Sequence, residues 1–216
     1  METLFEMINN TIELKNFGLN AVTISFIATL AITTLQIIAA IKQNQRIRKN
    51  RSGEAWTLSL FAYLSFYFLS FLFYGISRNS LALFLSGIPG FFYIPILINI
   101  WIYQENSKFD RISSILLFFV VPLIAISQYK GLIILLIFGL GAIAMLIQTY
   151  KMVKNKDYKD VEPVFLISFF VSSLFWFIYS TAINDRAVQT SSGLSLIFLI
   201  VLLSLYYQWK HKRSAK

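Results

Sequence analysis

The chain has 216 residues, of which 57% are hydrophobic and 13% are charged, and none is cysteine. Soluble domains carry roughly 25% charged residues, and a soluble core of this size cannot bury so much apolar surface. The composition therefore predicts an integral membrane protein and excludes disulfides, cysteine-based metal sites and thiol catalysis. The net charge of +9 does not indicate nucleic-acid binding, because the basic residues flank apolar segments.

Apolar segments that can cross a bilayer, which takes about 20 residues each, follow an N-terminal arm at 1–16. They lie at 17–41, 55–77, 80–103, 112–128, 131–153, 163–183 and 188–208. We therefore predict an all-α membrane protein with seven transmembrane helices and little chain outside the bilayer. The one histidine, His211, lies in a basic tail at 210–216, so we expect no metal site, no cofactor and no catalytic residue.

Positive charges are distributed unequally between the two sides of the predicted bilayer. The links on one side hold 15 Lys and Arg residues, and those on the other hold four: Lys15, Arg78, Lys130 and Arg186. Because cytoplasmic links are enriched in Lys and Arg, we predict that the N-terminus is outside and the C-terminus is cytoplasmic. The basic segments at 46–51 and 210–216 are expected to contact anionic lipid. Short links and a Lys-, Ile- and Asn-rich composition favour a bacterial inner membrane.

An internal repeat relates the two halves of the chain by a shift of 105 residues without a gap. The shift pairs polar and aromatic residues that rarely match by chance: Gln43 with Gln148, Lys49-Asn50 with Lys154-Asn155, Tyr74 with Tyr179, and Asn79 with Asn184. We interpret this as a first three-helix repeat (17–104), a linker helix with its loops (105–130) and a second three-helix repeat (131–209). Such a 3+1+3 arrangement makes the repeats parallel and predicts a substrate site near the midplane, where they meet.

Short motifs recur in the same order in both repeats. The first repeat reads Gln43, Lys49-Asn50-Arg51, Phe71-Leu72-Phe73-Tyr74-Gly75 and Ser86-Gly87; the second reads Gln148, Lys154-Asn155-Lys156, Trp176-Phe177-Ile178-Tyr179, Asn184-Asp185 and Ser192-Gly193. In order and spacing these motifs resemble the PQ-loop superfamily, and within it the SWEET sugar transporters (MtN3/saliva type). The resemblance implies a uniporter that moves a sugar-like solute by alternating access.

Two departures from the family pattern affect this expectation. The prolines of the family motif are replaced by Lys42 and Ile147, so bending would have to come from Gly139 and Gly141 or from Pro89 and Pro95. The two asparagines that bind sugar in the family are replaced by Ser86 and Ser192. We therefore expect a small, neutral, polar solute, with a sugar as one possibility.

The resemblance also assigns roles to individual residues. Trp176 and its counterpart Phe71 would stack on the substrate, and Ser86 and Ser192 would donate hydrogen bonds to it; the alternative is that all four only pack between helices. A second group would act in gating: Gln43, Gln148, Tyr74, Tyr179 and Asp185. Gln43 and Gln148 would tie helix ends together at the cytoplasmic side, or they are simply solvated. Asp185 would orient a loop at the outer side.

No Asp, Glu, Lys, Arg or His lies in the middle of any predicted span. Proton-coupled transporters use such groups to carry the proton, so the sequence favours facilitated diffusion. It also excludes a retinal protein and intramembrane proteases, which need a lysine, acids or metal ligands within a span. The alternatives that share this architecture are a Pnu-type vitamin or nucleoside carrier and a non-transporting ligand or sorting receptor like the KDEL receptor. The expected partners are a small-molecule substrate, lipid and, in a homo-oligomer, further copies of the chain.

Overall fold

The computed structural model describes the backbone of residues 10–53, 56–155 and 163–214. Within these ranges, seven helices are long and apolar enough to cross a membrane. They are α3 (Ala21–Asn50), α4 (Leu58–Ser77), α5 with α6 (Leu81–Ser86 and Pro89–Tyr103), α7 with α8 (Lys108–Phe118 and Val120–Ile126), α9 (Lys130–Asn155), α10 (Pro163–Ala182) and α11 (Arg186–Ser214). A short helix, α2 (Ile12–Lys15), lies in the N-terminal arm. Lys156 of the second basic motif lies outside the described residues.

Side-chain caps fix where several of these helices begin. The Asn20 side chain accepts a hydrogen bond from Thr23 N, the Thr57 hydroxyl from Leu60 N, and the Ser80 hydroxyl from Leu83 N. These caps satisfy backbone donors that have no partner within the helix. They explain why the first span begins at residue 21 rather than at the predicted 17. That helix continues to residue 50 rather than 41. The predicted span counted only apolar residues, whereas the helix includes two further turns of mostly polar residues.

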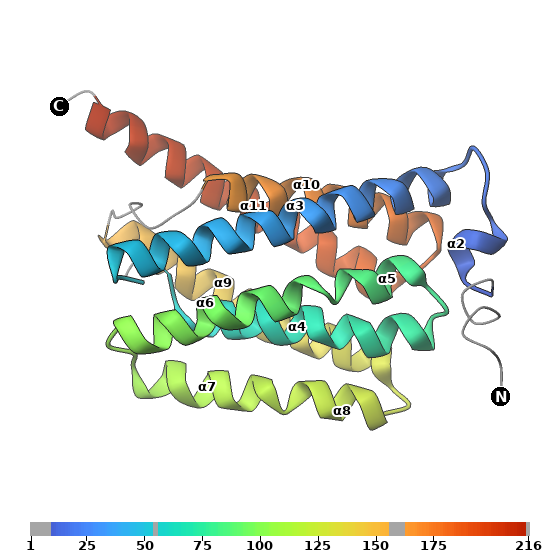
Figure 1. Cartoon of the computed structure of the whole chain (residues 1–216), viewed down its shortest axis with the longest axis horizontal. Coiled ribbons are helices and arrows are strands. Elements are labelled where there is room, and N and C mark those ends of the chain that lie inside the picture. Colours follow the sequence, from blue (N-terminus) through green and yellow to red (C-terminus); the bar gives the residue numbers. More distant parts are fainter. Residues whose placement is uncertain (1–9, 54–55, 156–162, 215–216) are drawn as a thin grey trace.

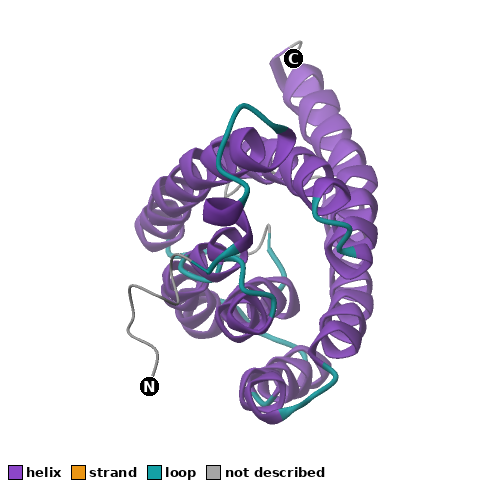
Figure 2. Cartoon of the chain, turned by 90° about the vertical axis from the view of Figure 1, so that its right-hand side faces the viewer, coloured by secondary structure: helices purple, strands orange, loops and turns teal. Residues whose placement is uncertain are grey.

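The two repeats have the same internal arrangement; Figure 1 labels their helices, and Figure 2 shows the helix bundle end-on. In the first repeat α6 packs against both α3 and α4, and in the second repeat α11 packs against both α9 and α10. Across the repeats α3 packs against α10, and α4 packs against α9. The linker helix α7–α8 lies on α4 and α9. The predicted fold, two parallel three-helix bundles joined by a linker helix, is confirmed.

The turn between the second and third helix of each repeat has the same backbone conformation. Asn79 ends this turn in the first repeat with φ of 50°, and Asn184 occupies the equivalent place in the second with φ of 58°. Asparagine is one of the few residues that enters this left-handed region readily. The Asn79–Asn184 match in the sequence therefore reflects a shared backbone geometry.

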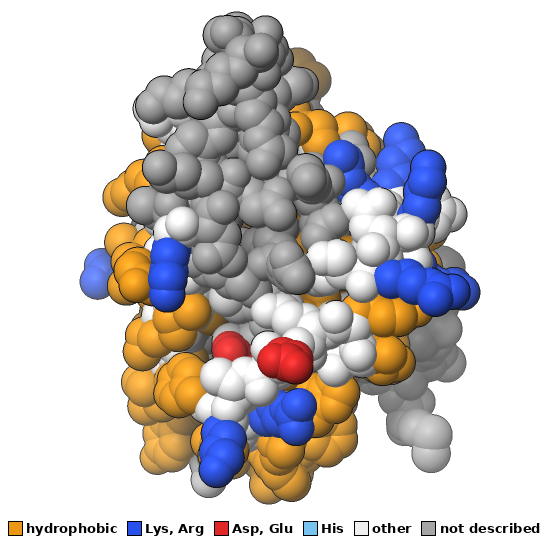
Figure 3. Space-filling view, turned by 90° about the vertical axis from the view of Figure 1, so that its left-hand side faces the viewer, with side chains coloured by type: hydrophobic (Ala, Val, Ile, Leu, Met, Phe, Trp, Pro, Cys, Tyr) orange, Lys and Arg blue, Asp and Glu red, His pale blue; other side chains and the backbone are white. Residues whose placement is uncertain are grey.

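The two ends of the bundle differ in charge. We call the end that carries α2 the arm end, and the opposite end, where α3 and α9 finish, the basic end. Figure 3 shows Lys and Arg side chains around the basic end. The basic residues near the end of α3 and the start of α7 that are exposed include Lys42, Arg48, Lys49, Lys108 and Arg111. Between the two ends, large apolar side chains such as Ile27, Phe91 and Leu136 are more than half exposed. This is the surface of a protein whose sides face lipid.

Candidate functional site

A cavity of about 70 Å³ lies between the two repeats. It is lined by side chains from α3, α4, α9, α10 and α11: Gln36, Tyr63, Leu64, Tyr67, Phe68, Phe71, Met145, Phe169, Ser172, Ser173, Trp176, Val188, Ser191, Ser192, Ser195 and Leu199. Tyr67 and Ser172 stand near the middle of α4 and α10. The cavity therefore lies about half-way along the helices, as expected for a site between parallel repeats.

The α4 side of the cavity is aromatic. Tyr63, Tyr67 and Phe71 are spaced four residues apart, so they share one face of the helix. The Tyr63 and Tyr67 rings stack with their centroids 5.1 Å apart, and Phe71 meets Tyr67 edge-on at 4.8 Å. The Tyr67 hydroxyl donates to the Ser191 hydroxyl at 3.2 Å. This wall therefore combines ring surface with a hydroxyl that is tied to the opposite repeat.

Phe71 and Trp176, the predicted stacking pair, face each other directly. Their rings are nearly parallel, with an angle of 13° between planes and 6.2 Å between centroids. A flat solute inserted between two rings needs roughly 7–8 Å from one ring plane to the other, because carbon atoms in contact are about 3.5–4.0 Å apart. The two rings are therefore in position to sandwich a solute, but only after the repeats separate by an ångström or more.

Gln36 is the most unusual polar group of the cavity. It lies on α3, its side chain is 1% exposed, and its Nε2 atom has no hydrogen-bond partner among the described residues. A buried donor left without a partner costs about 1–3 kcal/mol. A solute with a hydroxyl or carbonyl oxygen would satisfy this donor. Gln36 was missed in the sequence, although a lone amide in the middle of an apolar span is itself a signal.

The two predicted substrate serines differ in their placement. Ser192 lines the cavity, and its hydroxyl donates to Val188 O at 2.7 Å. Ser86 is buried, donates to Leu83 O within its own helix, and is not among the cavity residues. The 105-residue shift pairs Ser86 with Ser191 rather than with Ser192. Ser191 is the serine that bonds to Tyr67, and sequence reasoning missed it along with Ser172, Ser173 and Ser195.

Gln43 and Gln148, the predicted gating glutamines, are both fully buried towards the basic end. Gln148 Oε1 accepts a hydrogen bond of 2.8 Å from Thr57 N, the residue that precedes α4. Gln148 therefore joins α9 of the second repeat to the start of α4 in the first. Nearby, the Trp56 ring packs edge-on against Phe165 of α10, with centroids 5.6 Å apart. Contacts between the repeats thus lie on the basic side of the cavity.

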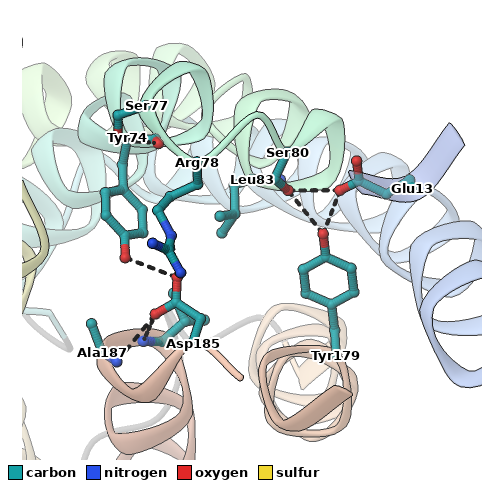
Figure 4. Close-up of polar contacts among 10 residues, drawn as sticks. Glu13, Tyr74, Ser77, Arg78, Ser80, Leu83, Tyr179, Asp185 and Ala187 are labelled. Carbon is teal, nitrogen blue, oxygen red and sulfur yellow. Dashed lines mark hydrogen bonds and ion pairs between the residues drawn. The ribbon is translucent and has the colours of Figure 1, made fainter. Parts of the chain in front are cut away.

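Asp185, Tyr74 and Arg78 join the repeats at the arm end (Figure 4). The Tyr74 hydroxyl, at the end of α4, donates to Asp185 Oδ2 at 2.8 Å, and Arg78 Nε lies 3.3 Å from the same oxygen. The other oxygen, Oδ1, accepts from Ala187 N and Val188 N at the start of α11. Asp185 therefore caps a helix of the second repeat and binds two side chains of the first.

Tyr179, the counterpart of Tyr74, makes a similar contact with a different partner. Its hydroxyl lies 2.8 Å from Ser80 Oγ and donates to Glu13 of α2 (Figure 4). Glu13 also accepts from the Ser80 hydroxyl at 2.6 Å and from Leu81 N and Ala82 N, each at 3.0 Å. Glu13 is completely buried. No motif or repeat in the sequence pointed to Glu13, because the arm lies outside the repeat.

Three comparisons with known proteins bear on this arrangement. Residues 131–214 match the family model described as "Sugar efflux transporter for intercellular exchange". The fold is similar to a solved structure of a eukaryotic SWEET transporter, with a TM-score of 0.56 and 18% sequence identity over 87% of this chain and 99% of that one. No curated protein matches the sequence. The family match covers the second repeat, whereas the likeness in fold extends over both.

Seven apolar helices in a 3+1+3 arrangement, with a cavity between the repeats, define an integral membrane protein with two parallel three-helix repeats. The second repeat thus matches the sugar efflux transporter family, and the fold of both repeats is SWEET-like, in agreement with the resemblance that the motifs predicted. Groups of acidic, His or Cys side chains that could hold a metal ion are absent from the described residues.

Proposed function

We propose that the protein carries a small, neutral, polar solute, sugar-like in its hydroxyl groups, down its concentration gradient by alternating access. The observation that carries this proposal is the lining of the cavity. Hydroxyl and amide groups stand beside aromatic rings there, and no ionisable acidic or basic side chain is among the lining residues that the structure describes. A neutral solute needs no charged partner, and a cavity without acids or bases offers no carrier for a coupled proton.

The chemistry of the lining defines what the solute should offer. Aromatic rings cover the apolar face of a ring-shaped solute. The unpaired Gln36 Nε2 requires an acceptor oxygen, and the serine hydroxyls of α10 and α11 can donate or accept. A pyranose or another polyhydroxylated ring presents both features. The proposed substrate is therefore a compact ring with several oxygen atoms and no net charge.

The size of the cavity supports a conformational cycle. Pockets that hold small molecules usually measure about 300–1,000 Å³, whereas this one measures about 70 Å³. Contacts between the repeats lie on both sides of it, at Gln148 with Thr57 and at Asp185 with Tyr74. The described conformation is thus closed around a site that must expand to admit a solute, which rocking of one repeat against the other would achieve.

For the orientation, we propose that the arm end is outside and the basic end is cytoplasmic, in a bacterial inner membrane. The exposed Lys and Arg side chains of the basic end support this proposal, since such residues are enriched on the cytoplasmic side. A reporter active only in the periplasm and one active only in the cytoplasm, fused in turn to Lys216, test it. Activity of the periplasmic reporter would overturn the assignment.

Uptake by proteoliposomes tests the transport proposal. Vesicles would be offered radiolabelled hexoses, disaccharides, nucleosides and charged amino acids, with and without a pH difference. We expect saturable equilibration of one neutral class that does not depend on the pH difference. Gln36→Leu should slow it about tenfold or more, because the donor is lost, whereas Gln45→Leu, at an exposed position of the same helix, should leave it unchanged. Uphill accumulation driven by protons would refute the passive mechanism.

A flat heterocycle, as in a vitamin or nucleoside, is the second candidate for the solute. The parallel Phe71 and Trp176 rings favour it, because two flat surfaces pair best with a third. Competition separates the two candidates. If a nucleoside or thiamine-like compound inhibits uptake at a lower concentration than any sugar does, the protein belongs with the vitamin carriers of this architecture.

A further inference from the structure

The arm end carries two carboxylates that each accept from backbone N–H groups of one repeat and from a tyrosine of the other, although they do not occupy equivalent places in the sequence. Asp185 accepts from the backbone of Ala187 and Val188 and from Tyr74 of the other repeat. Glu13 accepts from the backbone of Leu81 and Ala82 and from Tyr179 of the other repeat. The shift of 105 residues pairs Tyr74 with Tyr179 and Ala82 with Ala187. The two sets therefore share the tyrosine and one backbone donor, Ala82 or Ala187; Val188 corresponds to Leu83, whose N–H donates to Ser80 instead.

The residue that the repeat pairs with Asp185 is Ser80. The Ser80 hydroxyl caps its helix by accepting from Leu83 N at 3.1 Å, but a hydroxyl supplies no negative charge for the tyrosine of the opposite repeat. Glu13 lies against Ser80 at 2.6 Å and provides the carboxylate that position 80 lacks. We infer that the N-terminal arm completes the gate of the arm end, which is the set of side-chain contacts that join the two repeats there. Glu13 is a positioning residue that substitutes for the acid missing from the first repeat. It holds Tyr179 while the repeats are closed.

The arm is attached to the first repeat and not to the second. Ile12 N donates to Asn79 O at 2.8 Å, and Glu13 accepts from Leu81 N and Ala82 N of the same turn. Separation of the repeats at this end would therefore leave Glu13 on the first repeat and break its bond to Tyr179. A charge-assisted bond of this kind is stronger than a neutral one. Glu13 thus stabilises the closed arrangement relative to the open one, whichever solute is carried.

The absence of cysteine from the whole sequence makes the test direct. Cysteines would be placed at Ile76, exposed at the end of α4, and at Thr190, exposed near the start of α11. Spin labels at both positions report the separation of the repeats at the arm end by pulsed electron resonance in nanodiscs. No substrate or transport activity is needed. Failure of the transport proposal and failure of this one are therefore distinguishable.

We expect a single short distance between the two spin labels when the rest of the chain is wild type. Glu13→Ala should raise the ratio of long to short distances about tenfold or more, as the loss of one charge-assisted hydrogen bond implies. Tyr179→Phe should do the same, and the double variant should add little. Glu105→Ala, an exposed carboxylate at the basic end, is the matched control and should change nothing.

Rescue distinguishes a gate residue from one that merely holds the arm. Ser80→Asp in the Glu13→Ala background places the acid where the second repeat has it, and aspartate is as good a helix cap as serine. We expect this double variant to restore the short distance. If Glu13→Ala is not monodisperse, Glu13→Gln, which keeps the shape but not the charge, takes its place. Unchanged distances in both Glu13 variants, or no recovery with Ser80→Asp, would overturn the inference.

Discussion

On α4 the wall of the cavity is mostly aromatic, whereas α10 adds two serines, Ser172 and Ser173, to its aromatic Phe169 and Trp176. The shift of 105 residues pairs Tyr63 with Ser168, Tyr67 with Ser172 and Phe68 with Ser173. Only the next pair, Phe71 and Trp176, is aromatic on both sides. Two helices with the same place in the fold therefore differ in chemistry, because only α10 adds hydroxyl groups of serine to its aromatic rings. Together they offer ring surface and hydroxyl groups, which suits a solute with an apolar face and a polar edge.

The difference in side-chain volume between α4 and α10 is compensated by the side chains of α9 and α3, the first helices of the two repeats. A methyl group on Gly141 of α9 would lie 2.1 Å from the Tyr63 ring, so this glycine makes room for the tyrosine. Its counterpart on α3 is Gln36, and the counterpart of Tyr63 is Ser168. The order of sizes is therefore exchanged in the sequence, since Gln36 is larger than Gly141 and Ser168 is smaller than Tyr63. The exchange keeps the packing density of an interior and places the Gln36 amide in the cavity.

The largest difference between the repeats, in the loss of unfolding free energy on substitution, should appear at the arm end. Asp185→Ala removes the acceptor for Tyr74, Arg78 and two backbone donors, and we expect it to lower the free energy of unfolding by about 2–4 kcal/mol. Ser80→Ala should lower it by about 1 kcal/mol, as for the loss of a helix cap, because Glu13 still accepts from Tyr179. Reversible unfolding in mixed micelles measures both. Equal losses for the two variants would contradict the expectation that Glu13, and not Ser80, supplies the acceptor in the first repeat.

Removal of one ring from the stacked pair should weaken binding. By analogy with bases stacked on aromatic side chains, Trp176→Ala should lose about 1–3 kcal/mol, which is roughly a 5- to 150-fold loss of affinity. Phe71→Ala should lose less, because Tyr67 and Phe68 remain on that wall. Phe177→Ala, on the exposed side of α10, is the control. Calorimetry with the solute found in the uptake screen decides, and wild-type affinity in Trp176→Ala would mean that the ring only packs.

Gly141 and Gly139 give a matched pair for the size compensation. Gly141→Ala forces the Tyr63 ring to move, and overpacking of about 1–3 kcal/mol exceeds the gain of roughly 0.5–1 kcal/mol from better helix propensity. We expect a net loss of stability of about 1 kcal/mol and weaker binding of the solute. A Cβ at Gly139 meets nothing within 4 Å, so Gly139→Ala should be neutral or stabilising. Thermal unfolding in detergent compares the two, and equal melting temperatures would contradict the role of Gly141.

The serines should give the smallest effects. Ser192→Ala removes a hydroxyl from the cavity and should weaken binding by about 0.5–1.5 kcal/mol if that hydroxyl reaches the solute. Ser86→Ala should not change affinity, because Ser86 lies away from the cavity and bonds within its own helix. The same calorimetric titration applies to both variants. A loss in Ser86→Ala that matches the loss in Ser192→Ala would mean that the described conformation does not show the whole site.

The sequence by itself determined the membrane class, the seven helices and their 3+1+3 grouping. Apolar segments of bilayer length can only be helices, since the backbone has no other partner in lipid. The repeat then fixed which helices correspond, because residues such as Asn79 and Asn184 meet the same backbone requirement. It also pairs Phe71 with Trp176 and Tyr74 with Tyr179, and the resemblance to the family added Asp185; all five contact residues of the other repeat. The two aromatic pairs stood out because they are duplicated, whereas Asp185 has Ser80 at its counterpart position.

Only the tertiary structure decided which groups complete the site. Ser191 lines the cavity in place of Ser86, and Gln36 stands in it without a partner, because these outcomes depend on how each helix is rotated about its axis. Side-chain packing between helices sets that rotation, and hydropathy along the chain does not record it. Glu13 is the clearest case, since it reaches the gate from an arm with no counterpart in the repeat. The contact between Glu13 and Tyr179 depends on how the two repeats pack against each other. A local sequence pattern does not predict that packing.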